Sequence, residues 1–230
     1  MYPENTLLAF SKAKSINKLT GIELDIQMSK DGHMVVFHDE RVDRVTNGIG
    51  EVRLHSLSDL KKLRIRAENG IEERIPTIEE VLDLLEPSFE KGLKLNIELK
   101  NSDCPYDGME EKIIDLIHTR DVQNYIIYSS FSAISLEKIK KIDPLAETGI
   151  LDRKVSDCLF KLRGGCGATA LHPHWKDIDL EIDKLKGYNV RAWFTGHLYP
   201  EKPTGVKLNL EDLESKGITD VFLNEPEIYL

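Results

Sequence analysis

Apolar and polar residues alternate along several short segments of this 230-residue chain, most clearly near its start. Glu23 and Asp25 alternate with apolar residues in the segment 22–26. A β-strand sends alternate side chains to opposite faces, so the two carboxylates project together. The turn residues Lys30-Asp31-Gly32 follow, and an apolar run then returns before His38. This order predicts a hairpin that folds His38 back towards Glu23 and Asp25.

A second segment with the same alternation spans residues 93–100. Leu95, Ile97 and Leu99 take one face, and Asn96, Glu98 and Lys100 take the other. If the two strands are neighbours in a closed sheet, Glu98 completes a three-carboxylate site with Glu23 and Asp25. Oxygen ligands of this kind suit one hard divalent cation, Mg²⁺ or Ca²⁺, and Lys100 offers a positive charge for a phosphate group. The alternative at this stage is a solvated strand face, where carboxylates are ordinarily found.

Strand-like and helix-like segments alternate through the rest of the chain, which predicts an α/β fold. Helices are expected at 5–18, at 77–85 with a cap at Thr77, and around Leu57–Leu63. The expected strands are 23–27, 93–100, 125–129, 147–151, 168–172, 190–194 and 220–223. This length and pattern suit a single (β/α)8-type barrel domain over 1–230, with a small insertion at about 40–75.

Composition narrows the functional class. The net charge of −9 argues against nucleic acid as a partner, because binding to phosphate backbones depends on clustered Lys and Arg. No apolar run is long enough for a membrane span. The three cysteines are widely spaced, without a CxxC pair, which argues against a disulfide framework and against a zinc site. Such cysteines favour a reducing compartment and therefore a cytoplasmic location.

Several motifs together resemble those of bacterial-type glycerophosphodiester phosphodiesterases. The two specific ones are Pro3-Glu4-Asn5-Thr6, and the segment Gly21–Gln27 followed by Lys30-Asp31-Gly32 and Val36-Phe37-His38-Asp39. Weaker matches follow in the family's order: Asp43-Arg44 with Thr46-Asn47-Gly48, Ile75-Pro76-Thr77, Ile97–Lys100, Ser129–Phe131, Trp193 and Leu223–Pro226. The resemblance implies a TIM (β/α)8 barrel of the phospholipase C-like phosphodiesterase type.

The resemblance also implies an activity, the metal-dependent hydrolysis of a small-molecule glycerophosphodiester to sn-glycerol 3-phosphate and an alcohol. Glu23, Asp25 and Glu98 are then the metal ligands, and His38 is a general acid or base. Lys100 is expected to stabilise charge on the phosphate. The expected substrate contacts also include Phe131, His172 and Trp193, which lie at or near the carboxyl ends of predicted barrel strands, where such enzymes place their sites.

The sequence also allows a structural interpretation of Trp193 and of His172. A lone tryptophan such as Trp193 is more often a core residue, and His172 and His174 are each more often packed or solvent-facing than bound to substrate. The remaining histidines, His33, His55, His118 and His197, are expected at the surface.

The family also places a His-Arg-Gly tripeptide on a first barrel strand, upstream of Pro-Glu-Asn-Thr, and it carries a second catalytic histidine. This sequence contains no such tripeptide, and its predicted barrel strands number seven. We expect the chain to start at an internal methionine of a longer enzyme, because a barrel without one strand leaves exposed sheet edges. Without the second histidine, turnover is expected to fall by about two to four orders of magnitude.

Three other functions stay open at this stage. A truncated or inactive relative would bind a phosphodiester without turnover. A related phospholipase-type phosphodiesterase would release a cyclic phosphate by internal attack of a hydroxyl group. A metal-dependent aldolase on the same fold gives no reason for the Phe37-His38-Asp39 motif. The sequence leaves the head group of the substrate, the choice between Mg²⁺ and Ca²⁺, and homodimer formation undetermined.

Overall fold

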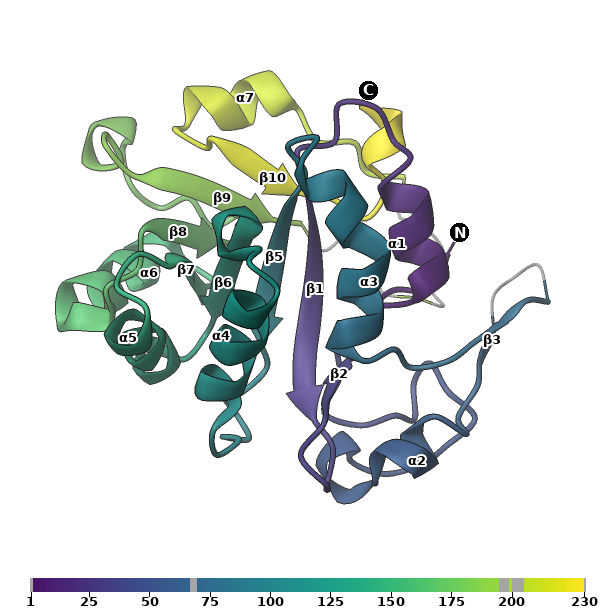
Figure 1. The fold of residues 1–230 in the computed structure, drawn as a ribbon. Helices are drawn as coiled ribbons and strands as arrows, with labels where there is room; N and C mark the ends of the chain where they lie inside the picture. The colour runs from purple at the N-terminus through teal and green to yellow at the C-terminus, as the bar shows by residue number, and fades with distance from the viewer. Residues whose placement is uncertain (1, 67–69, 195–198, 200–204, 230) are drawn as a thin grey trace. The chain divides into compact units, whose positions relative to one another are not determined.

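The computed structural model of the chain describes residues 2–66, 70–194, 199 and 205–229 (Figure 1). The surface position predicted for His197 lies outside these residues. None of the described helices is both long and apolar enough to cross a membrane. The chain forms two compact units, residues 1–126 with 230 and residues 127–229, and each is described by itself. The prediction of a single domain with an insertion stays a prediction.

The first unit contains the predicted hairpin and both acidic strands. Its elements are α1 (Leu7–Ala13), β1 (Gly21–Met28), β2 (Met34–Val36), η1 (Val52–Leu54), α2 (Leu57–Leu60), β3 (Ile65–Arg66), β4 (Glu72–Glu73), α3 (Ile78–Phe89), β5 (Lys94–Leu99), α4 (Met109–Thr119) and η2 (Gln123–Tyr125). β1 pairs antiparallel with β2 and parallel with β5. The turn between β1 and β2 has Gly32 at φ +80°, a conformation that glycine adopts without strain.

The alternation of side chains along β1 and β5 separates an apolar face from a polar one. Leu24, Ile26, Leu95 and Ile97 are fully buried on the apolar face. The other face carries the acidic residues, and the parallel register sets Asp25 opposite Glu98. The predicted neighbourhood of these two strands is therefore confirmed.

Local capping explains where α1 and α3 of the first unit begin. Thr77 and Glu80 form a reciprocal capping box at the start of α3, as the sequence predicted, and Thr6 caps α1 by accepting from the Ala9 amide. The helix predicted at 5–18 is shorter: Asn5 has a positive φ angle and Thr6 is an extended cap, so α1 begins at Leu7, and it ends at Ala13, before Lys18. Figure 1 shows α1 and α3 side by side next to β1.

The second unit continues the alternation of strands and helices. Its elements are β6 (Ile126–Ser130, beginning at the boundary), α5 (Ala133–Ile142), β7 (Glu147–Asp152), α6 (Val155–Lys161), a short π-helical turn η3 (Leu162–Cys166), β8 (Ala170–Pro173), η4 (Ile182–Lys184), β9 (Asn189–Trp193), α7 (Leu210–Ser215), β10 (Asp220–Phe222) and η5 (Pro226–Ile228). Strands β6 to β10 pair in chain order, each parallel to the next.

Parallel strands that pair in chain order, with helices between most of them, are typical of the TIM-barrel class, whereas doubly wound sheets change their strand order, and the predicted fold class is confirmed. Each of the seven predicted barrel strands appears among the described residues, as β1 and β5 to β10. The predicted helix around Leu57–Leu63 is reduced to the single turn α2. The antiparallel pair of β3 and β4 accounts for part of the surrounding segment.

Candidate active site

Three carboxylates converge on the polar face of β1 and β5. Glu23 and Asp25 come from β1, and Glu98 comes from β5. Each offers an oxygen atom, and these oxygens all lie within 4.8 Å of one another. The structure therefore brings together the three residues that the sequence predicted as metal ligands.

The electrostatics of this cluster favour a nearby positive charge. Burial, followed by the charges of Asp25 and Glu98, raises the pKa of Glu23 well above its ordinary value. Burial and the charge of Asp25 raise the pKa of Glu98 to about 7. Carboxylates that share a buried site disfavour each other's ionised form unless a positive charge lies between them. The donor set, three carboxylates without sulfur or imidazole, fits a hard divalent cation such as Mg²⁺ or Ca²⁺.

Lys100 supplies part of the positive charge. Its Nζ lies 3.1 Å from Oε1 of Glu98 and 3.8 Å from Oδ1 of Asp25, and its side chain is 15% exposed. Burial alone would lower the pKa of Lys100, but Glu98 and Asp25 raise it above its usual range, so the ammonium stays charged. The residue expected to bind phosphate thus lies beside the predicted metal ligands.

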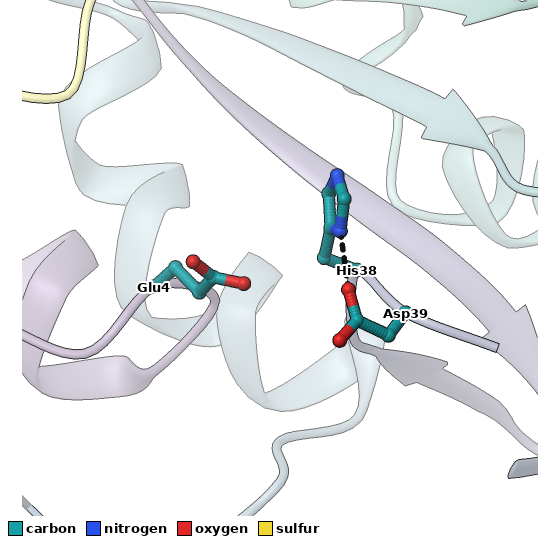
Figure 2. A group of neighbouring side chains, drawn as sticks. All are labelled: Glu4, His38 and Asp39. Carbon is teal, nitrogen blue, oxygen red and sulfur yellow. Dashed lines mark hydrogen bonds and ion pairs between the residues drawn. The ribbon is translucent and has the colours of Figure 1, made fainter. Parts of the chain in front are cut away.

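His38 lies just beyond β2, where the chain runs back along β1. The amide of Phe37 donates to the carbonyl of Asp25 (3.0 Å), which fixes the approach of this segment. The Nδ1 atom of His38 is 2.7 Å from Oδ1 of Asp39 (Figure 2). Because Asp39 is held ionised, Nδ1 carries the proton and donates it to Asp39. Among the described residues, nothing hydrogen-bonds to the second ring nitrogen, Nε2.

Arg44 holds the carboxylate that orients His38. Its Nε and Nη2 atoms lie 2.6 and 2.8 Å from the two oxygens of Asp39, and Nη2 also pairs with Glu4. Burial alone would raise the pKa of Asp39, but the hydrogen bonds from His38 and Arg44 hold it far below its usual range. Burial would lower the pKa of His38, yet the bond to Asp39 and the charge of Asp25 raise it.

Glu4, His38 and Asp39 also lie close enough together to resemble a second metal site (Figure 2). The guanidinium of Arg44 already forms ion pairs with both carboxylates and offsets part of their charge. The cluster is therefore better described as a histidine oriented by a carboxylate that an arginine holds in place.

The sequence reasoning gave no role to four residues that support this site. Asn5 hydrogen-bonds Asp25, and Gln27 donates to the carbonyl of Phe37 at 3.0 Å. Arg44 and Asp39 form the pairs described above. Each lies in a motif that resembles the family's, but the sequence has no signal that shows which partner an arginine or an amide takes.

The second unit contains the remaining predicted site residues. The rings of Phe131 and Trp193 meet edge to face, with centroids 6.3 Å apart, and both side chains are partly exposed. The indole nitrogen of Trp193 donates to the carbonyl oxygen of His172 at 3.1 Å. The ring of His174 lies 4.5 Å from that of Trp193.

His172 was expected to contact substrate, but the structure buries it completely. Its ring packs 5.3 Å from that of Phe222 and lies over Gly149, where a Cβ atom would be 2.2 Å away. Neither ring nitrogen has a hydrogen-bond partner among the described residues. This position fits the packed histidine that the sequence left as the alternative. Of the four histidines expected at the surface, His33 and His118 are exposed and His55 is partly so.

Comparison with known proteins places the chain among enzymes of one kind. Residues 1–161 match the sequence model of the glycerophosphoryl diester phosphodiesterase family. A glycerophosphodiester phosphodiesterase of Caldanaerobacter subterraneus is 36% identical over 98% of this chain and 90% of its own length. A Bacillus subtilis glycerophosphodiester phosphodiesterase is 32% identical over 99% of this chain and 80% of its own.

Solved structures give the same result at the level of the fold. An Oleispira antarctica phosphodiesterase, solved in complex with the product sn-glycerol-3-phosphate, superposes with a TM-score of 0.72 at 26% identity, over 96% of this chain and 87% of that one. A glycerophosphodiester phosphodiesterase from Thermotoga maritima superposes with a TM-score of 0.70 at 23% identity, over 99% of this chain and 91% of that one.

Proposed function

We propose that this chain, which belongs to the glycerophosphoryl diester phosphodiesterase family, hydrolyses glycerophosphodiesters to sn-glycerol 3-phosphate and an alcohol. Members of this family are phosphoric diester hydrolases. The proposed reaction uses one divalent cation. The observation that carries this proposal is the convergence of Glu23, Asp25 and Glu98 within 4.8 Å. The product complex of the Oleispira antarctica relative supports the choice of substrate.

Glu23, Asp25 and Glu98 would hold Mg²⁺ or Ca²⁺, which would act as a Lewis acid on the phosphate oxygens. Lys100, whose ammonium is already held by Glu98 and Asp25, would stabilise the charge that builds on the phosphoryl oxygens. Both contributions concern the phosphate, which every glycerophosphodiester shares.

His38 would transfer a proton. In the hydrolysis, a water oxygen bonds to phosphorus, the bond from phosphorus to the alcohol oxygen breaks, and the proton lost by water is balanced by one gained by the alcohol. Since Asp39 accepts from Nδ1, Nε2 of His38 is the atom that would give or take one of these protons. A proton-transfer group of this type contributes about 10²- to 10⁴-fold to the rate.

The expected substrate contacts of Phe131 and Trp193 are likewise part of this proposal, with Trp193 next to the glycerol. Their edge-to-face pair offers an apolar wall of the kind that packs against carbon chains. Substitution of Trp193 by Phe is then expected to raise KM more than it lowers kcat. The cytoplasmic location stays a prediction, and homodimer formation stays undetermined.

The test uses the purified protein with glycerophosphocholine as the probe, and follows phosphorus products by NMR with Mg²⁺, with Ca²⁺ and with EDTA. We expect sn-glycerol 3-phosphate and choline in the presence of a cation and none in EDTA. Glu98→Gln should abolish the reaction, whereas Glu111→Gln, an exposed position on α4, serves as the matched control. A cyclic phosphate product, binding without turnover, or full turnover in EDTA would contradict the proposal.

A further inference from the structure

Two adjacent residues before α1 contact both halves of the site. The side-chain amide of Asn5 donates to Oδ2 of Asp25 at 2.8 Å, and the backbone amide of Asp25 donates back to Oδ1 of Asn5 at 3.3 Å. The neighbouring Glu4 pairs with Arg44, which in turn holds Asp39 beside His38. A single loop therefore contacts the carboxylate cluster and the histidine arrangement.

We propose that Glu4 and Asn5 are positioning residues that set the carboxylate of Asp25 for a cation and the ring of His38 for proton transfer. This inference rests on the proposed function, because it assigns Asp25 as a metal ligand and His38 as the acid or base. Neither Glu4 nor Asn5 needs to touch the substrate in this role.

The contacts of Asn5 divide the two oxygens of Asp25 between two tasks. Oδ2 accepts the hydrogen bond from Asn5, while Oδ1 lies 3.8 Å from the ammonium of Lys100. Asp25 is 3% exposed, so water has little access to restrain its rotation. A neutral amide suits this position, because it stabilises the ionised carboxylate without adding a positive charge that would compete with a cation.

The backbone of the loop explains why an asparagine stands at this point. Asn5 has φ +53°, in the left-handed region that asparagine tolerates better than most residues with a Cβ atom. Thr6 locks the loop on the other side, since its hydroxyl donates to the carbonyl of Pro3 at 2.8 Å and caps α1. Thr6 is fully buried. The loop is thus held at both ends and presents its two polar side chains in a fixed direction.

The pair of Glu4 with Arg44 joins residues 40 positions apart in the sequence. Arg44 makes hydrogen bonds to both Asp39 oxygens. Its Nη2 atom, which donates to Oδ1 of Asp39, also donates to Glu4. Loss of the Glu4 charge removes one of the carboxylates that pair with Arg44. The orientation of the His38 ring then depends on a less restrained arginine.

Asn5→Gly tests the first contact, because glycine adopts the left-handed conformation freely and removes only the side chain. Loss of a partner that orients a metal ligand weakens metal binding by about 10- to 100-fold. We expect this increase in the Kd for Mn²⁺, measured by calorimetry without substrate, and recovery of kcat at saturating cation. Lys18→Gly is the matched control, since Lys18 is exposed and has φ +69°.

Glu4→Gln tests the second contact, by removal of the charge with little change of shape. We expect an unchanged Mn²⁺ affinity, a lower kcat, and a shifted or exchange-broadened proton NMR signal from Nδ1 of His38. Glu51→Gln is the control, because Glu51 pairs with Arg53 in a similar Glu–Arg contact at 2.6 Å. A variant that merely loosened the fold would lower the melting temperature but leave the His38 signal in its wild-type position.

The two variants separate this inference from the proposed function. A wild-type protein that binds no divalent cation would overturn the proposed function and the inference with it. A wild-type protein that binds Mn²⁺, with the same affinity in Asn5→Gly, would overturn the role of Asn5 alone. An unchanged Nδ1 signal and kcat in Glu4→Gln would overturn the role of Glu4.

Discussion

Removal of the ammonium of Lys100 should lower the stability of the metal-free protein against unfolding and raise its affinity for a divalent cation. In Lys100→Met the stem of the side chain stays, but the charge 3.1 Å from Glu98 and 3.8 Å from Asp25 is lost. Those carboxylate side chains are only 13% and 5% exposed, so water compensates poorly. The three carboxylates then repel one another without the nearest positive charge.

The magnitude follows from the burial of the ion pair. Loss of one partner from a buried pair costs about 3–5 kcal/mol, because the other charge is left uncompensated. For a chain of this size, each kcal/mol shifts Tm by about 2–4 °C, so the metal-free variant should melt roughly 6–20 °C below wild type. The lysine also competes with a cation for the same oxygens. Its removal should therefore lower the Kd for Mg²⁺ by about tenfold or more, a change of about 1.4 kcal/mol.

The assay combines calorimetric titration with Mg²⁺ and thermal unfolding in EDTA and at saturating Mg²⁺. The Tm difference between variant and wild type should be large in EDTA and should shrink with the cation, while kcat falls about 10²- to 10³-fold from loss of charge stabilisation. Lys112→Met, at an exposed position on α4, controls for loss of a lysine. A variant as stable as wild type in EDTA, or one that binds Mg²⁺ more weakly, would refute the reasoning.

Three further predictions concern single residues. His38→Ala should lower kcat by about 10²- to 10⁴-fold with the Mg²⁺ affinity unchanged in calorimetry, and a variant that keeps most of its activity would exclude His38 as the acid or base. Gly149→Ala should lower the free energy of unfolding by about 1–3 kcal/mol in urea titrations, because the new Cβ would lie 2.2 Å from the ring of His172, and His172→Ala in the same chain should restore part of the loss. Burial and the charge of Arg191 lower the pKa of His172 to about 3. The stability that the neutral His172 ring contributes to the folded state is therefore full above pH 6.5. It is lost as the pH falls towards 3, by about 1.4 kcal/mol of unfolding free energy per pH unit. Urea titrations between pH 7 and pH 4 should show this slope in wild type and a smaller one in His172→Leu; equal slopes would contradict it.

Local patterns in the sequence were enough to predict the strands that carry the candidate site and the face on which each side chain lies. The period of two in the segments 22–26 and 93–100 gives the face of each side chain, and a strand cannot move one residue without exposing its apolar half. The turn at Lys30-Asp31-Gly32 gave the direction of the returning arm. Helix ends were less accurate, because the positive φ angle of Asn5 and the extended conformation of Thr6, which precede α1, leave no mark on hydrophobic periodicity.

The sequence by itself indicated the candidate site residues, because Glu23, Asp25 and Glu98 lie on the polar faces of two predicted strands, with Lys100 at the end of the second and His38 after the hairpin turn. Only the tertiary structure decided how these groups are paired. The register that sets Asp25 opposite Glu98, and the placement of Arg44 between Glu4 and Asp39, join residues from distant parts of the chain. It also decided that His172 lies in a packed interior. The physical reason is that periodicity reports the face on which a side chain lies, whereas charge pairing and burial depend on which other segments fold against that face.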